Sequence, residues 1–245
     1  EASRAHEKQY LERVFSLNLS KKERKIIGLE PIEFFANRAL YSSAGTLLAA
    51  RLAIKKGAAI NMAGGSHHAS YFHGAGYCIF NDVAITLNIL LSEDVISSAL
   101  VIDLDVHQGD GTAQIFREDD RVFTASIHCK DNYPLEKSIS DLDIGLNRGA
   151  DDRAYFHALG KLLEMIENKR FDLIIYNAGV DIHHDDKLGL LSVSSMGIRI
   201  REKIVIDFAR RKNIPLAVVL GGGYNTDTKH LAVLHSYVFS ALLDF

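Results

Sequence analysis

The chain has 245 residues, of which 47% are hydrophobic and 24% charged, which is typical of a globular protein and too apolar for a disordered one. Its formal net charge of −3 lacks the basic excess of nucleic-acid-binding domains, so we expect no direct contact with nucleic acid. No apolar run approaches the ~20 residues of a membrane-spanning helix. Two cysteines are too few for a disulfide framework, which favours a reducing compartment: the cytoplasm or, in a eukaryote, the nucleus.

Five short apolar runs alternate with longer amphipathic segments. The short runs are continuously apolar, as strands are when helices cover both faces of a sheet. This alternation indicates an α/β fold built on a mainly parallel sheet. No linker divides the sequence, so we expect one domain over residues 1–245, and we interpret the charged run Lys21–Lys25 as a solvated turn or helix face. In chain order we expect a helix over Ser42–Lys56, a strand over Ala58–Met62, a helix over Asn81–Leu91, strands over Ala99–Leu104 and Val122–Ile127, a helix over Asp151–Asn168, a strand over Leu173–Tyr176, a helix over Ser195–Lys212, a strand over Leu216–Leu220 and a helix over Thr228–Leu243.

A cluster of polar residues or glycines lies at the end of each expected strand. Because the carboxyl ends of parallel strands share one edge of a sheet, and ligands bind at that edge, we expect these clusters to converge on one crevice. The five clusters are Gly64–His68, Asp103–Gly111, Ser126–His128, Asn177–Asp181 and Gly221–Tyr224.

Three of these residues form a plausible metal-ligand set. Asp105 and His107 are two positions apart, so their side chains point to the same side of an extended segment. Asp181 can approach from a neighbouring strand end. Two carboxylates and one imidazole suit a divalent cation, and zinc with a fourth position open to water is favoured, although iron(II) accepts the same donors.

Two adjacent histidines, His67 and His68, are candidates for acid–base catalysis. A carboxylate behind an imidazole fixes its tautomer and raises its basicity, and Asp103 and Asp110 are available for this role. Two His–Asp pairs beside a metal suit a general base and a general acid. Tyr224, after three glycines, could place its hydroxyl over the site and stabilise an oxyanion.

These motifs resemble those of the histone deacetylase family, which also includes bacterial acetylpolyamine amidohydrolases and acetoin-utilisation-type proteins. The resemblance runs from about His6 to the C-terminus. The variants HQGDGT, SDLDI (Ser140–Ile144) and D-x-LG-x-LS look most like class IV and related bacterial deacetylases. The strongest matches are GGSHHA at Gly64–Ala69, GAGYCIFND at Gly74–Asp82, VIDLDVHQGDGTAQIF at Val101–Phe116, NAGVDIHHDDKLGLLSVS at Asn177–Ser194 and LGGGYN at Leu220–Asn225.

The resemblance implies the arginase–deacetylase fold, a single mainly parallel sheet between layers of helices. The sheet has eight strands in the family, and we expect the family's first strand and opening loop to be missing before Glu1. The resemblance also implies roles for single residues. The zinc ligands are matched by Asp105, His107 and Asp181. The tandem catalytic histidines are matched by His67 and His68, with Asp103 and Asp110 as partners, and His68 matches the principal general base. Tyr224 matches the tyrosine that polarises the acyl carbonyl.

Further positions match substrate and ion contacts of the family. Gly76 matches the glycine whose carbonyl accepts the substrate amide N–H, and Tyr77 matches the aromatic wall of an acyl-lysine tunnel. Gly222 is assigned to substrate binding. Ser126 matches a ligand of a structural potassium ion, which also uses main-chain oxygens of Asp103, Asp105 and His107.

The function implied is a zinc-dependent deacylase acting on N-acetyl-lysine, or a longer N-acyl-lysine, in proteins. Three alternatives stay open: a deacetylase of acetylated polyamines or other small amines, a catalytically silent acyl-lysine binder, and an arginase-like manganese hydrolase. The tandem His183-His184 is interpreted as a solvated loop, with a rim contact or an adventitious metal site as the sharper hypothesis. The sequence leaves the oligomeric state open.

Overall fold

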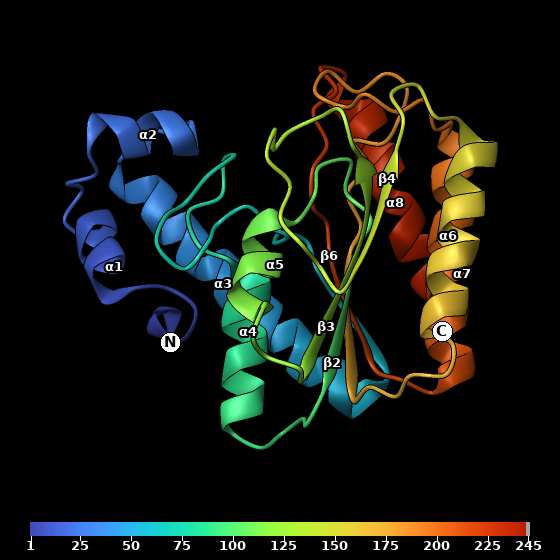
Figure 1. Cartoon of the computed structure of the whole chain (residues 1–245), viewed down its shortest axis with the longest axis horizontal. Coiled ribbons are helices and arrows are strands. Elements are labelled where there is room, and N and C mark those ends of the chain that lie inside the picture. Colours follow the sequence, from blue (N-terminus) through green and yellow to red (C-terminus); the bar gives the residue numbers. More distant parts are fainter. Residues whose placement is uncertain (244–245) are drawn as a thin grey trace.

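The computed structural model describes residues 1–243. These residues form one six-stranded sheet in the order β1-β6-β5-β2-β3-β4, and every neighbouring pair of strands is parallel (Figure 1). The predicted α/β class with a parallel sheet is therefore confirmed, with six strands among the described residues where the family resemblance implied eight. The strands are β1 (Ala58–Asn61), β2 (Ala99–Asp103), β3 (Val122–Cys129), β4 (Leu142–Leu146), β5 (Leu173–Asn177) and β6 (Leu216–Val219).

Helices cover both faces of the sheet (Figure 1). One face carries α3, α4 and α5, with α1 and α2 outside α3; the other carries α6, α7 and α8. Among the described residues, no helix is both long and apolar enough to cross a membrane. The helices are the short 3₁₀-helix Ala2–Arg4, α1 (Lys8–Phe15), α2 (Lys21–Ile27), α3 (Glu33–Lys56), α4 (Asp82–Ser92), α5 (Asp110–Phe116), α6 (Asp152–Ile166), α7 (Ser195–Lys212) and α8 (Thr228–Leu242).

The sequence patterns located most strands of the sheet but missed several shorter elements. Each predicted strand is present and ends within two residues of its expected position. The edge strand β4 was missed because its residues alternate between buried and exposed and include an aspartate. The run Lys21–Lys25 lies in helix α2, whose first turn is fixed by a capping box between Ser20 and Glu23. Helices α1 and α5 were also missed, and α3 begins at Glu33 rather than Ser42.

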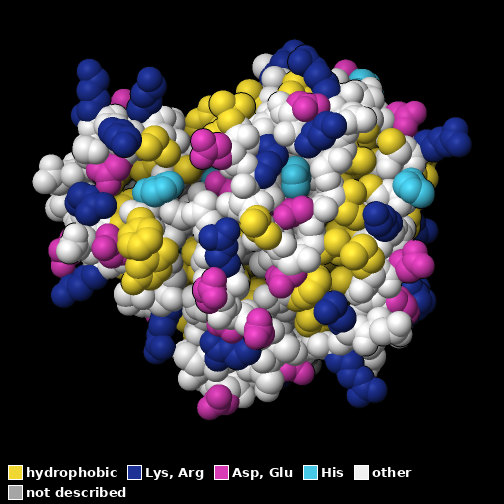
Figure 2. All heavy atoms as spheres, in the orientation of Figure 1, with side chains coloured by type: hydrophobic (Ala, Val, Ile, Leu, Met, Phe, Trp, Pro, Cys, Tyr) yellow, Lys and Arg dark blue, Asp and Glu magenta, His cyan; other side chains and the backbone are white. Residues whose placement is uncertain are grey.

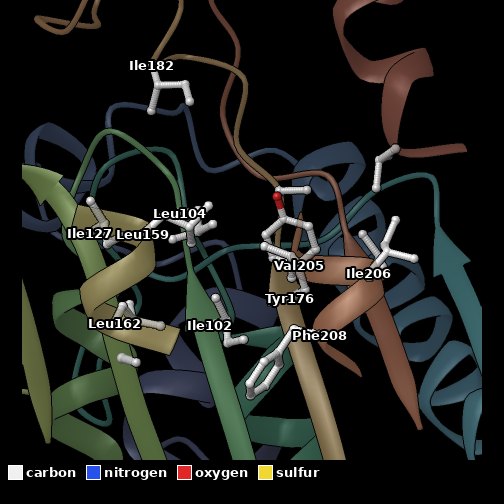
Figure 3. Packing of buried hydrophobic residues seen from close by; sticks show 14 of the residues in the cluster. Ile102, Leu104, Ile127, Leu159, Leu162, Tyr176, Ile182, Val205, Ile206 and Phe208 are labelled. Carbon is white, nitrogen blue, oxygen red and sulfur yellow. The ribbon is translucent and has the colours of Figure 1, made fainter. Parts of the chain in front are cut away.

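Alternate residues of the central strand β2 enter two hydrophobic clusters. Leu100 and Ile102 pack in the cluster that faces α6 and α7, and Ala99 and Val101 pack in the cluster on the side of α3 and α4. Figure 3 shows the first cluster, in which Leu159 of α6 and other helix residues meet the strands. The polar residues at the carboxyl end of β2 thus extend from a strand that is held on both faces.

The visible surface mixes charge types. The face in Figure 2 interleaves Lys and Arg with Asp, Glu and hydrophobic side chains rather than gathering basic residues into one patch.

Candidate active site

The clusters after the strands converge as predicted. The last register pair between β2 and β5 is Asp103 with Asn177, and the chain leaves the sheet just beyond it on both strands. A cavity of about 290 Å³ lies at this edge of the sheet. Its lining includes Gly64–His68, Gly76–Ile79, Asp105 and Gly221–Tyr224, together with residues of α3.

The predicted metal ligands come together. Asp105, His107 and Asp181 are buried, and one ligand atom from each lies within 4.8 Å of the others. His107 Nδ1 is 3.1 Å from Asp105 Oδ1 and 3.2 Å from Asp181 Oδ2. Asp181 Oδ2 is buried without a hydrogen-bond partner among the described residues. An orphaned carboxylate oxygen beside a second carboxylate and an imidazole is the donor arrangement that a divalent metal satisfies.

The ionisation of the two carboxylates differs. Burial and the neighbouring Asp105 carboxylate raise the pKa of Asp181 to about 7. Burial also opposes ionisation of Asp105, but the charges of His67 and His107 hold its pKa well below its usual range. Burial lowers the pKa of His107, but its hydrogen bond to Asp105 and the charges of Asp105 and Asp181 raise it to about 10.

Backbone amides orient the two carboxylates. Gly222 N–H donates to Asp105 Oδ2 at 2.7 Å, and Val106 N–H donates to Asp181 Oδ1 at 2.8 Å. A Cβ atom at Gly222 would lie 2.2 Å from Asp181 Oδ2, so only glycine fits there. Gly222 thus contacts the ligand carboxylates directly, and its contact with substrate stays a prediction.

Both predicted His–Asp pairs are present. His67 Nδ1 is 2.7 Å from Asp103 Oδ2, and His68 Nδ1 is 2.6 Å from Asp110 Oδ1. The two rings lie against each other with centroids 4.1 Å apart. Asp110 is the first residue of α5, which the sequence patterns did not predict. The described residues leave Nε2 of His68 without a hydrogen-bond partner, so this nitrogen is free to act on a substrate.

The loop that carries the two histidines is fixed by Asn81 and Asp82 of the GAGYCIFND motif, to which the sequence patterns assigned no part in the site. The buried Asp82 accepts hydrogen bonds from the amides of Gly65 and Ser66 and from the Thr46 hydroxyl. Asn81 caps α4 through its side-chain oxygen and donates to the Ala69 carbonyl. Asn81 at the start of a predicted helix indicated a helix cap. Nothing in the sequence indicated that Asn81 and Asp82 would also bind the loop that carries His67 and His68.

Tyr224 lies at the junction of two cavities. Its amide donates to Asp186 Oδ2 at 2.6 Å, and its ring centroid is 6.2 Å from that of Tyr77 and 6.3 Å from that of His107. Burial and the nearby carboxylates raise the pKa of the Tyr224 hydroxyl, which keeps it protonated. A neutral hydroxyl at this position can donate a hydrogen bond to a carbonyl oxygen.

The second cavity, of about 280 Å³, adjoins the first and shares His68, Gly76, Tyr77 and Tyr224 with it. Gly76 and Tyr77 both adopt positive φ, and a Cβ on Gly76 would lie 2.5 Å from Cδ2 of His68. This tight approach places the Gly76–Tyr77 backbone against the His68 ring. The other lining residues are Lys25–Gly28, His107, Asn132, Tyr133 and Leu188.

Sequence reasoning missed one wall of this outer cavity. Tyr133 packs edge-on against His68 with ring centroids 4.8 Å apart. On the opposite wall, the end of α2 is tied to the Tyr77 loop by hydrogen bonds from Gly76 and Tyr77 to the carbonyls of Ile26 and Ile27. Tyr133 lies in a loop without a recognisable pattern, so only the tertiary structure identifies it.

Ser126 is the register partner of Asp103 on the neighbouring strand β3. Its hydroxyl is 3.0 Å from Nδ1 of His128, and it is buried. This placement brings together Ser126 and the backbone of Asp103, as a shared ion site would require, and potassium binding there stays a prediction.

The interpretation of His183-His184 as a solvated loop is wrong for the first histidine. His183 is only 2% exposed, and its Nε2 is 2.9 Å from the Ser195 hydroxyl. His184 is exposed, with Nε2 3.3 Å from Asp185 Oδ1. The error arose because the segment folds back on the start of α7, a contact that no local pattern encodes.

Comparisons with known proteins find relatives over most of the chain. A family model described as "Histone deacetylase domain" matches residues 1–242. An uncharacterised protein of Picosynechococcus sp. is 41% identical over 98% of this chain and 80% of its own length. "Histone deacetylase 2" of Arabidopsis thaliana is 36% identical, over 89% of this chain. The chain spans 59% of that deacetylase and 42% of "Histone deacetylase clr6" of Schizosaccharomyces pombe, which is 35% identical over 68% of this chain.

Solved structures share the fold at lower sequence identity. The acetylpolyamine aminohydrolase from Burkholderia pseudomallei superposes with a TM-score of 0.80 at 19% identity, covering 98% of this chain and 81% of its own. A homologue of the histone deacetylases, solved in complex with SAHA, gives a TM-score of 0.82 at 24% identity over 98% of this chain and 68% of its own. These likenesses confirm the predicted arginase–deacetylase fold.

Proposed function

Because the chain belongs to the histone deacetylase domain family, we propose that it is a metal-dependent amidohydrolase that removes an acetyl group, or a longer acyl group, from lysine side chains of proteins. The observation that carries this proposal is the convergence of three metal-ligand side chains, two His–Asp pairs and Tyr224 around connected cavities. A protein that only recognised acyl-lysine would have no need of this whole set.

The metal would be held by Asp105, His107 and Asp181. The orphaned Oδ2 of Asp181 and the close approach of the three ligand atoms fit a divalent cation. Zinc is favoured, and iron(II) suits the same two carboxylates and one imidazole. When bound, the metal supplies Lewis acidity, which polarises an amide carbonyl and makes water a stronger nucleophile at neutral pH. A second, manganese-binding cluster is disfavoured because Asp103 and Asp110 are committed to the histidines.

The chain's own residues would move the protons. His68 Nε2 accepts a proton from the attacking water, while Asp110 holds the opposite nitrogen and fixes the ring. The protonated His68 then donates to the nitrogen of the leaving lysine amine. Tyr224 donates a hydrogen bond to the carbonyl oxygen as negative charge develops on it. His67, held by Asp103, contributes a positive charge next to the reacting amide.

The outer cavity favours an acylated protein side chain over a polyamine. Its walls include Ile26, Tyr77, Tyr133 and Leu188, which suit the methylene groups of a lysine. Within the described chain, its lining includes the basic side chain of Lys25 and no Asp or Glu. A polyamine would carry further positive charges into that lining without a carboxylate to meet them, whereas a lysine embedded in a protein would not. We assign the Gly76 carbonyl as acceptor for the substrate amide N–H and Tyr77 as one wall.

Hydrolysis of an acetyl-lysine peptide by the zinc-loaded protein tests the proposal. We expect release of acetate that stops when a chelator removes the metal and returns when zinc is restored. Asp181→Ala should lose both zinc and activity because its carboxylate is a ligand. The matched control is His157→Ala, an exposed histidine of α6, which should keep both. Absence of acetate release from folded, zinc-containing protein, with release from acetylpolyamines instead, would replace the protein substrate with a small amine.

A further inference from the structure

A fully buried arginine lies directly behind the metal-ligand residues. Arg201 of α7 is 0% exposed. Its Nη1 donates to the carbonyl of Gly179 at 2.6 Å and to that of Leu104 at 3.2 Å. Its Nη2 donates to the carbonyl of Ala178 at 3.3 Å. Leu104 immediately precedes the ligand Asp105, and the other two carbonyls lie on the segment that leads to the ligand Asp181. One side chain therefore holds both backbone segments that carry the ligand carboxylates.

The strands need such a partner at this point. Pairing between β2 and β5 ends at Asp103 and Asn177, with one further bond from the Leu104 amide to the Asn177 carbonyl. Beyond it the described residues form no backbone hydrogen bond between the two segments, so their buried carbonyls need other donors, and a buried carbonyl without a donor is costly in the interior. A guanidinium group offers five N–H donors in a rigid plane and can serve several carbonyls at once.

The charge of Arg201 is neutralised in place. The neighbouring Glu202 is also buried and accepts a hydrogen bond from Nη2 of Arg201. Tyr176 of β5 donates its hydroxyl to Glu202 Oε2 at 2.5 Å, and Figure 3 shows this ring standing among apolar side chains such as Val205 and Phe208. A buried ion pair is weak evidence for stability, because apolar residues of similar volume often stabilise a protein as well or better. Stability alone therefore gives a poor reason for an arginine here.

The backbone segments that Arg201 binds are in direct contact with the carboxylates of Asp105 and Asp181. A Cβ atom on Gly179 would lie 2.4 Å from Asp105 Oδ2, so the Gly179 backbone is pressed against the Asp105 carboxylate. On the other side, Asp181 Oδ1 accepts from the Val106 amide at 2.8 Å, which links the second ligand to the first segment. A shift of the carbonyls bound by Arg201 would therefore change the spacing of the two carboxylates.

We propose that Arg201 is a positioning residue for the metal: by binding the carbonyls of Leu104, Ala178 and Gly179, it fixes the separation of the Asp105 and Asp181 carboxylates. This inference rests on the proposed function, since it requires a metal held by Asp105, His107 and Asp181. It assigns to a non-ligand on α7 a share of the metal affinity and of the coordination geometry.

Metal binding to the metal-free full chain tests the inference, with cobalt(II) as a coloured probe and zinc affinity from competition with a chelator. The variants are Arg201→Lys, which keeps the charge beside Glu202 but not the planar donor set, and Arg201→Met, which removes both. Leu162→Ala is the control, because it opens a cavity in the same hydrophobic cluster on α6 without touching the site. Thermal unfolding of each protein reports its stability.

We expect zinc affinity to fall about 10-fold or more in Arg201→Lys and further in Arg201→Met, as for other residues that orient metal ligands. The visible spectrum of bound cobalt should change in both. Leu162→Ala should lose thermal stability yet keep the wild-type affinity and spectrum. If Arg201→Met does not fold, Arg201→Lys alone decides the matter.

Two kinds of result would separate failure of this inference from failure of the proposed function. Wild-type affinity and an unchanged cobalt spectrum in folded Arg201→Lys would overturn the positioning role while leaving the metal site intact. The positioning role would also be overturned if Leu162→Ala weakened zinc binding as much as Arg201→Lys does at equal stability. Cobalt binding by wild type that survives Asp181→Ala would instead show that the metal is held elsewhere.

Discussion

The two His–Asp pairs are built from the same side chains at similar distances, yet they hold protons differently. Burial works to lower the pKa of His67, but the carboxylates of Asp103 and Asp105 together raise it to about 9. Burial lowers the pKa of His68 as well, and the charge of His67 adds to this, so that Asp110 leaves it at about 4. At neutral pH one ring is charged and the other is a free base. Asp105 acts on both rings, so the difference arises because burial and the charge of His67 outweigh Asp110 and Asp105 at His68.

Removing each histidine in turn tests whether His67 and His68 have different roles. His68→Ala should lower kcat by about 10²–10⁴-fold, because it deletes the neutral ring that takes the proton from water. His67→Ala should lower kcat less, because it removes a nearby charge rather than the base. Rates on an acetyl-lysine peptide, at equal zinc content, measure both. Equal losses would show that the two rings share the proton transfer.

Tyr224→Phe removes the hydroxyl that neither pair can replace. We expect kcat to fall by about 10²–10³-fold, the cost of losing one donor to a developing oxyanion. Zinc content should stay at the wild-type level, because Tyr224 is not a ligand. Turnover that is unchanged, measured on the same peptide, would remove Tyr224 from the mechanism.

Replacing Asp103 or Asp110 by asparagine should shift opposite limbs of the pH profile of kcat/KM. Asp103→Asn removes a charge that raises the pKa of His67, so the alkaline limb should move toward neutral pH. Asp110→Asn removes the charge that partly restores the pKa of His68, so the acid limb should move to lower pH. Each variant should also lose about 10-fold in rate through poorer orientation of its ring. The pH dependence of kcat/KM measures both limbs; movement of the same limb in the two variants would contradict these assignments.

His6 gives the case of a buried histidine with no carboxylate partner. Burial lowers its pKa to about 4, and its neutral Nε2 accepts the Asn81 amide at 2.8 Å. The unfolded chain, with a pKa near 6.5, binds the proton first, so this contribution to stability is complete above about pH 6.5 and is lost as the pH falls toward 4. Between pH 7.5 and pH 5 the loss is about 2 kcal/mol.

Urea unfolding of the metal-free protein at these two pH values measures that loss. His6→Gln, which does not titrate, should show a smaller decrease in the free energy of unfolding than wild type. The difference between the two proteins isolates His6 from His68, His128 and His235, whose pKa values burial also lowers. An identical decrease in both proteins would show that His6 titrates normally in the folded state.

The sheet class and five of the six described strands could be predicted from the sequence alone, which also singled out the side chains that we propose as metal ligands and catalytic groups. It could do so because a buried parallel strand reads as a continuous apolar run, and because ionisable residues directly after such a run have few structural reasons to be there. Asp105, His107 and Asp181 were therefore visible as a set before any contact was known. The same reasoning named Asp103 and Asp110 as available partners for the two histidines, and the structure shows which carboxylate meets which ring.

The residues that surround that set become visible in the folded chain alone. Tyr133 and the end of α2 form walls of the outer cavity, yet they lie in segments whose local pattern is that of any loop or short charged helix. Arg201 sits in a helix that ends in basic residues, and its sequence position does not distinguish it from its exposed neighbours. Its burial and its hydrogen bonds to carbonyls that follow β2 and β5 arise from packing between elements distant in the chain. Such contacts depend on how helices and strands meet, which local periodicity does not encode.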